Sequence, residues 1–142
     1  MSRDIFVDAG AWIALADADD QHHEQAAEVY PGLLRQYRHL VTTNLVVAEA
    51  YASIRRALTH QAAITFLDLV AQSPRIEKVY SSAALEAEAC NILRQHDDQP
   101  FSYADAVSFA LMRERGISEA FAFDKHFATA GFVRVPAATL RP

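Results

Sequence analysis

The chain has 142 residues, of which 51% are hydrophobic, and its formal net charge is −5. This length fits one domain, which we expect to span residues 1–142. The acidic balance argues against a generic nucleic-acid-binding protein, a class that is usually basic, unless several acids are gathered in one metal site. A single cysteine, Cys90, excludes an intrachain disulfide, and with no secretory leader after Met1 it predicts a cytoplasmic protein. No apolar run approaches the roughly 20 residues that span a bilayer.

The amino-terminal part of the chain alternates short apolar runs with helical patterns. The first run, "IFV", is followed by Asp8, and Gly10 marks a turn before the next apolar pattern begins. Pro31 is expected to interrupt the second helix, and Asn44 is expected to cap the helix that carries Glu49. The predicted strands cover 4–8 and 40–43, and the predicted helices cover 11–16, 21–30, 33–37, 44–54 and 60–72.

The carboxyl-terminal part continues this alternation and ends in an expected edge strand. Ser81 or Ser82 is expected to cap one helix, Ser102 opens the next, and Gly116 terminates it. The predicted strands cover 76–80, 120–123 and 132–135, and the predicted helices cover 82–96, 102–115 and 125–129. Strands that alternate with helices predict an α/β fold in which a parallel sheet is covered by helices on both faces.

Four acids stand at similar places in this pattern. Asp8 ends the first strand, Asp124 ends the fourth, and Glu49 and Asp105 lie near the starts of two helices. Each has an ordinary structural interpretation, as a helix cap, as the partner of Ser102 in a capping box, or as a solvated helix acid. Ligands of open α/β sheets bind at the carboxyl ends of the strands. Four unrelated acids gathered at that edge are therefore a poorer explanation than one acidic pocket.

An acidic pocket of this kind requires a cation. Two carboxylates about 4 Å apart repel each other by roughly 4 kcal/mol at an effective dielectric constant near 20. Oxygen ligands with no histidine or cysteine beside them suit Mg²⁺ or Mn²⁺ and not Zn²⁺. Such an ion binds phosphate oxygens and lowers the pKa of a bound water molecule. The pattern therefore predicts metal-assisted hydrolysis of phosphodiester bonds.

Four stretches of the chain together resemble the PIN domain family, and within it the VapC-type toxin ribonucleases: "FVDAGAWIAL", "TTNLVVAEAY", "FSYADAVSFALM" and "AFAFDKHF". Their order and spacing cover nearly the whole chain. The resemblance implies a three-layer α/β/α sandwich with a mostly parallel sheet of four to five strands, and a metal-dependent endoribonuclease toxin. It implies that Asp8, Glu49, Asp105 and Asp124 are the catalytic and metal-binding acids. It also implies a cognate antitoxin, bound in a groove near the active site, and a homodimer.

Gly10 departs from the family pattern, which usually has serine or threonine two residues after the first aspartate. The missing hydroxyl motivates an alternative function, a non-catalytic PIN-like module that binds RNA or a protein. An aspartyl-phosphate phosphatase or a receiver domain fits poorly. The phosphatase class would have aspartate at position 10, and a receiver would have adjacent acids after its first strand.

Six further residues are candidates for supporting the site or contacting the substrate: Asn44, Ser102, Lys125, His126, Arg55 and Arg113. The first two could place polar groups beside the acids, the next two directly follow Asp124 and could meet a phosphate, and the two arginines could hold an RNA backbone. For each of them a helix cap or a solvated surface is the ordinary alternative. Trp12 and Leu15 are candidates for lining the antitoxin groove, or for the core or a dimer interface.

Overall fold

The sheet of the computed structural model, which describes residues 3–137, has five strands in the order β3-β2-β1-β4-β5. The strands are β1 (Ile5–Val7), β2 (Leu40–Thr43), β3 (Ile76–Val79), β4 (Glu119–Phe121) and β5 (Val133–Val135). Within the described residues all four strand pairs are parallel. The central strand β1 is completely buried, as its uninterrupted apolar sequence requires. The prediction that the last strand lies at an edge is confirmed.

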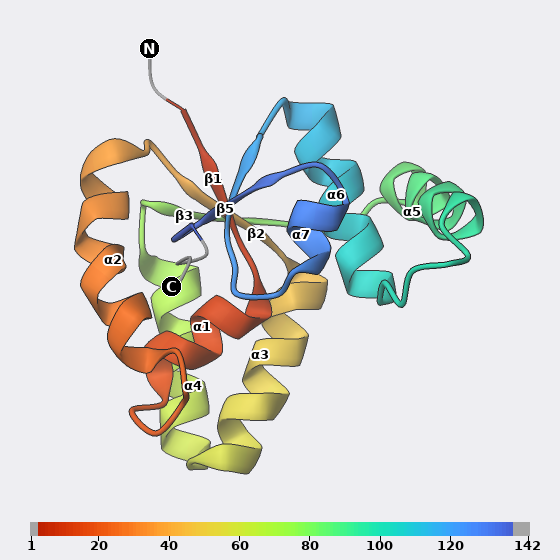
Figure 1. Cartoon of the computed structure of the whole chain (residues 1–142). Coiled ribbons are helices and arrows are strands. Elements are labelled where there is room, and N and C mark those ends of the chain that lie inside the picture. The colour runs from red at the N-terminus through yellow and green to blue at the C-terminus, as the bar shows by residue number, and fades with distance from the viewer. Residues whose placement is uncertain (1–2, 138–142) are drawn as a thin grey trace, which may run out of the picture.

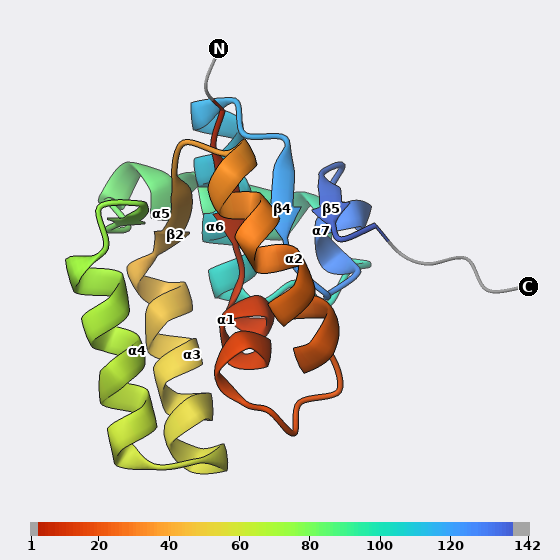
Figure 2. The ribbon, with the colours of Figure 1, turned by 90° about the vertical axis from the view of Figure 1, so that its left-hand side faces the viewer.

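Helices cover both faces of this sheet, so the predicted three-layer α/β/α sandwich is confirmed (Figures 1 and 2). The helices are α1 (Ala9–Ala16), α2 (His23–Gln36), α3 (Asn44–Ala57), α4 (His60–Gln72), α5 (Ala83–Gln95), α6 (Tyr103–Arg115) and α7 (His126–Thr129). Figures 1 and 2 show α2 over one face and α6 with α5 over the other. The α3–α4 pair forms a hairpin that extends beyond the carboxyl edge of the sheet. Between residues 3 and 137, no helix is long and apolar enough to cross a membrane.

Two buried side chains join the ends of β1 and β2 and so shape the carboxyl edge of the sheet. The Thr42 hydroxyl donates to the Val7 carbonyl at 3.1 Å. The Trp12 indole N–H donates to the Thr42 hydroxyl oxygen at 3.4 Å. Both side chains are inaccessible to solvent or nearly so, and these bonds satisfy their polar atoms. The first turn of α1 is therefore held against the strand end that carries Asp8.

Three local predictions were wrong. Pro31 does not interrupt α2, because Ala26 and Leu33 on either side of it pack into the same core and outweigh the one hydrogen bond that proline removes. Thr43, not Asn44, caps α3, and its hydroxyl accepts from the Val46 N–H at 3.1 Å. The strand β4 ends at Phe121, so the acid predicted at its end lies three residues further on, in a loop.

Candidate active site

Asp8 directly follows β1 and is only 8% exposed. It occupies the N-cap position of α1 but makes no capping hydrogen bond with its side chain, so it does not act as an ordinary helix cap. Burial raises the pKa of its carboxyl to about 7; the Ala9 backbone N–H opposes the shift, and the charges of three acids, Asp105, Glu49 and Asp124, add to it. A cation bound nearby would stabilise the ionised form of this carboxyl.

Asp105 is buried in the first turn of α6 and belongs to a capping box, as the spacing of Ser102 and Asp105 predicts. The Ser102 N–H donates to Asp105 Oδ2 at 3.1 Å, and the Asp105 N–H donates to Ser102 Oγ at 3.0 Å. The carboxylate Oδ2 also lies 3.1 Å from His126 Nδ1. Asp105 therefore belongs to a capping box and also lies among the acids, because the cap fixes the carboxylate at the carboxyl edge of the sheet.

Asp124 is held by His126 on two sides. The His126 backbone N–H donates to Asp124 Oδ1 at 2.8 Å, and His126 Nδ1 lies 3.2 Å from Asp124 Oδ2. Asp124 is not the N-cap of α7, since Lys125 occupies that position. Polar atoms of Asp105, Asp124 and His126 all lie within 4.8 Å of one another. Of the candidate supporting residues, His126 contacts both Asp105 and Asp124, and Ser102 is bonded to Asp105 alone among the acids.

Glu49 completes the acidic group from the second turn of α3. The residue as a whole is exposed, but partial burial of its carboxyl and the charges of Asp105 and Asp124 raise its pKa. The charges of the four predicted acids therefore interact at the carboxyl edge of the sheet. Asp8 and Glu49 lie outside the closest group of Asp105, Asp124 and His126 and interact with it through their charges.

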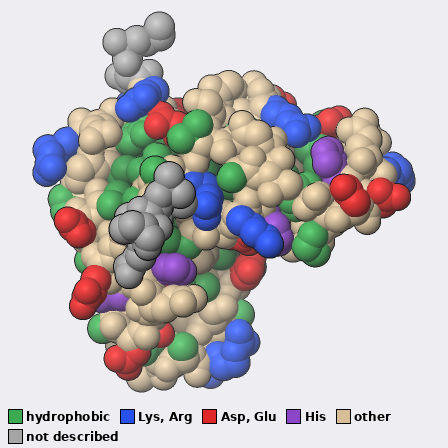
Figure 3. Space-filling view, in the orientation of Figure 1, with side chains coloured by type: hydrophobic (Ala, Val, Ile, Leu, Met, Phe, Trp, Pro, Cys, Tyr) green, Lys and Arg blue, Asp and Glu red, His purple; other side chains and the backbone are tan. Residues whose placement is uncertain are grey.

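This arrangement suits a divalent cation. The donors are carboxylate oxygens with one imidazole nitrogen. A bound cation would offset the burial, and the smaller repulsion from the other acids, that raise the pKa of Asp8. Figure 3 shows acidic, histidine and basic side chains next to one another over the region of α7. A phosphate group carried to this edge would meet both the acids and positive charge.

Residues 5–133 match the PIN domain family over most of the chain. The chain belongs to the PIN domain family. This PIN domain is 37% identical over 132 residues to the 23S rRNA-specific endonuclease VapC20 of Mycobacterium tuberculosis, a match that covers 92% of this chain and 97% of the relative. The predicted family, including its VapC-type group, is thereby confirmed.

Two solved structures have the same fold as this chain. The crystal structure of Mycobacterium tuberculosis VapC20, a sarcin-ricin loop cleaving toxin, superimposes on this PIN domain with a TM-score of 0.84 and 35% identity over 91% of this chain and 96% of that chain. FitAcB from Neisseria gonorrhoeae superimposes with a TM-score of 0.60 and 17% identity over 92% and 95% of the two chains, which shows the fold alone.

Three of the other candidate residues of this PIN domain lie away from the acids or are engaged elsewhere. Asn44 Oδ1 accepts from the Ser81 N–H at 2.8 Å and so secures the loop after β3. Arg55 lies in the exposed last turn of α3 beside His60, at 2.9 Å. Arg113 is exposed in the last turn of α6, about 12 Å along the helix axis from Asp105. By contrast, Lys125 is exposed directly beside Asp124.

Two aromatic contacts that the sequence does not predict support the Asp124 loop. The Phe101 ring packs edge-on against His126, with ring centroids 5.5 Å apart. The ring of His22, from the loop before α2, stacks on Phe123 with centroids 4.3 Å apart and an interplanar angle of 1°. Neither contact has a signal in the sequence, since the partners lie 25 or more residues apart.

Proposed function

We propose that this PIN domain is a divalent-metal-dependent endoribonuclease that acts as a toxin and is inhibited by a cognate antitoxin. The observation that carries the proposal is the buried Asp8 carboxyl, whose pKa of about 7 reflects burial beside three other acids. The similarity to a 23S rRNA-specific endonuclease over 92% of the chain supports RNA as the substrate.

We assign the binding of Mg²⁺ or Mn²⁺ to Asp8, Glu49, Asp105 and Asp124. When bound, the ion would activate a water molecule and neutralise charge on the scissile phosphate. The protein positions the reacting groups: the buried strand β1 holds Asp8, and the capping box holds Asp105. One carboxylate oxygen would orient the attacking water by accepting its hydrogen, so no side chain needs to form a covalent intermediate.

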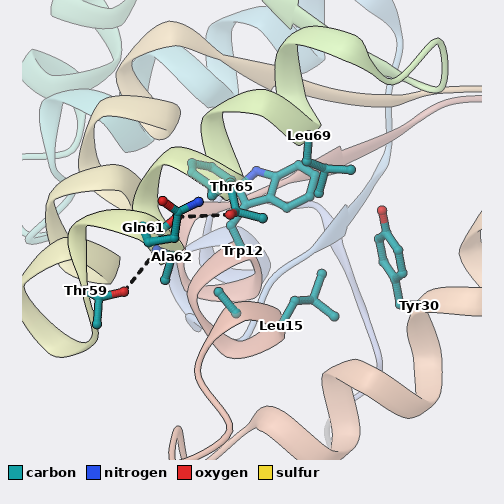
Figure 4. A pocket seen from close by; sticks show the side chains of 10 residues that line it. Trp12, Leu15, Tyr30, Thr59, Gln61, Ala62, Thr65 and Leu69 are labelled. Atoms are coloured by element: carbon teal, nitrogen blue, oxygen red, sulfur yellow. Dashed lines mark hydrogen bonds between the residues drawn. The ribbon is translucent and has the colours of Figure 1, made fainter.

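The antitoxin is proposed to bind an apolar groove that is lined in part by α1, the helix that follows Asp8. Side chains of α1, α2 and α4, with Thr59 before α4, line a cavity of about 710 Å³, and Figure 4 shows Leu15, Tyr30 and Leu69 bordering it. Trp12 lines this cavity, packs against Phe66 and lies one helical turn after Asp8. None of the four acids lines the groove, so an antitoxin segment bound there would have to extend along α1 toward Asp8 to block access to the site.

The first experiment is a cleavage assay with purified protein free of any partner. A mixed RNA pool and a sarcin-ricin loop RNA would be incubated with EDTA, Mg²⁺ or Mn²⁺, beside an Asp105→Asn control. We expect fragments that require metal and are absent with the control variant. RNA binding without cleavage under any metal would replace this proposal with the non-catalytic binding module that Gly10 motivates.

We further propose that the protein is a cytoplasmic homodimer, as the family resemblance and the single cysteine suggest. Sedimentation equilibrium of the purified protein tests the oligomeric state. A mass near the 15.7 kDa of one chain at micromolar concentration would contradict the dimer.

A further inference from the structure

We propose that His126 is a ligand of the metal ion, and that its imidazole makes this site prefer Mn²⁺ to Mg²⁺. The inference rests on the proposed function, because it concerns the same ion. It alters the expectation drawn from the sequence, in which the ligands were carboxylate oxygens alone.

The position of the His126 ring is restricted on three sides. Its side chain is only 18% exposed. The backbone N–H of the same residue is bonded to Asp124 Oδ1 at 2.8 Å, which fixes the start of α7 relative to this acid. The Phe101 ring packs edge-on against the imidazole and is itself buried. Nδ1 is therefore directed at the acids and has little freedom to turn toward solvent.

The distances among the three residues suit shared coordination of one ion. His126 Nδ1 lies 3.1 Å from Asp105 Oδ2 and 3.2 Å from Asp124 Oδ2. Neighbouring ligands that are each about 2.1 Å from an octahedral ion lie about 3.0 Å apart. Both distances are close to this value, and one polar atom from each of the three residues lies within 4.8 Å of the other two. The shorter of these two contacts, between Nδ1 and Asp105 Oδ2, also has the geometry of a hydrogen bond.

The chemical type of the ligands determines which ion this site binds more tightly. Mg²⁺ is a hard ion that binds oxygen almost exclusively, whereas affinity for imidazole nitrogen rises along the first-row transition metals from Mn²⁺ onward. Replacing one oxygen ligand by an imidazole therefore favours Mn²⁺. A carboxylate at position 126 would remove this preference and restore an all-oxygen site.

The test uses Mn²⁺ itself as the probe, on the purified full chain. Electron spin echo spectroscopy of bound Mn²⁺ detects coupling to a ligating ¹⁴N nucleus, and titration of the free Mn²⁺ signal gives the affinity. We expect ¹⁴N coupling in the wild type and its loss in His126→Asn, with an affinity for Mn²⁺ that is lower by about tenfold or more. The affinity for Mg²⁺, measured by competition, should change much less. His126→Asp should bind both ions with similar affinity.

His96→Asn is the matched control, because His96 also packs on Phe101, with centroids 5.7 Å apart, but touches no acid of the site. It should keep the ¹⁴N coupling and the Mn²⁺ preference. Mn²⁺ that binds the wild type without ¹⁴N coupling would overturn the role of His126 and leave the proposed nuclease intact. An absence of both Mn²⁺ and Mg²⁺ binding in the wild type would overturn both proposals.

Discussion

At the scale of single residues, Asp8 shows how the fold produces a reactive group. The strand before it is completely buried, so the carboxyl that ends the strand is also removed from water. Three further acids then add their charge, and the pKa rises to about 7. The folded protein without metal therefore binds a proton at Asp8 more tightly than the unfolded chain does.

This difference predicts how stability depends on pH in EDTA. The folded-state pKa of Asp8, about 7, lies above its ordinary value of 3.8, so its contribution to the free energy of unfolding falls as pH rises between these values and is constant above pH 7. Between pH 5 and pH 8 we expect a loss of about 3 kcal/mol, measured by urea denaturation. Asp8→Asn should abolish most of this loss. Asp19→Asn, which changes an exposed acid, should not.

Gly10 offers a second residue-level prediction. A Cβ atom at Gly10 meets nothing within 4 Å, and the residue lies inside α1. Gly10→Ala should therefore raise the free energy of unfolding by about 0.5–1 kcal/mol and leave RNA cleavage intact. Gly116→Ala is the matched contrast. Gly116 has a φ of 67°, which alanine adopts only with strain, so this variant should have a free energy of unfolding that is lower by about 1 kcal/mol. Loss of cleavage in Gly10→Ala would show that the site requires glycine itself.

At the scale of elements, the start of α6 joins structure to chemistry. The capping box satisfies the first N–H groups of this buried helix and holds the carboxylate of Asp105 toward the other acids. Helix α5 has an ordinary cap, in which Ser82 Oγ accepts from the Leu85 N–H at 3.1 Å, and the acid in its first turn, Glu86, is not one of the four acids of the site. Removing each cap in turn therefore separates the stability lost with any helix cap from the metal binding lost only when Asp105 is affected.

Ser102→Ala and Ser82→Ala should each lower the free energy of unfolding by about 1 kcal/mol. Only Ser102→Ala should also weaken Mn²⁺ binding and slow RNA cleavage, because the carboxylate of Asp105 loses the backbone geometry that orients it. Denaturation and metal titration of both variants check this. Equal metal affinity in the two variants would mean that the capping box is purely structural.

At the scale of the whole molecule, the sheet gathers acids from four separate segments. Parallel strands bring their carboxyl ends to the same edge, and α3, α6 and the loop before α7 all begin there. The acids interact only after the entire fold has formed, so their repulsion opposes folding in the absence of metal. Binding of an ion at this edge is therefore linked to global stability.

A divalent ion at about 100 times its dissociation constant should add about 2.7 kcal/mol to the free energy of unfolding. For a chain of this size the Tm should rise by roughly 8 °C, measured by calorimetry, and EDTA should reverse the rise. The increase should be much smaller in Asp105→Asn. A wild-type Tm unaffected by millimolar Mg²⁺ and Mn²⁺ would contradict the proposed metal site.

Much of this architecture could be predicted because its signals are local. Apolar runs separated by helical patterns predicted five strands and their parallel arrangement, and the spacing of Ser102 and Asp105 predicted the capping box. The Pro31 prediction failed because packing of both halves of α2 outweighed a local preference. The prediction that Asn44 caps α3 failed because Thr43 and Asn44 are both good capping residues, and only the backbone geometry selects between them.

The sequence by itself determined which acids follow buried strands and begin helices, because burial and capping depend on residue type and spacing. Only the tertiary structure decided that His126 lies between Asp105 and Asp124. Its ring direction depends on the turn of the loop after β4 and on Phe101, which is 25 residues away in the chain. Local spacing carries no information about such a contact. Three-dimensional packing therefore determined the composition of the site, while the sequence determined its location.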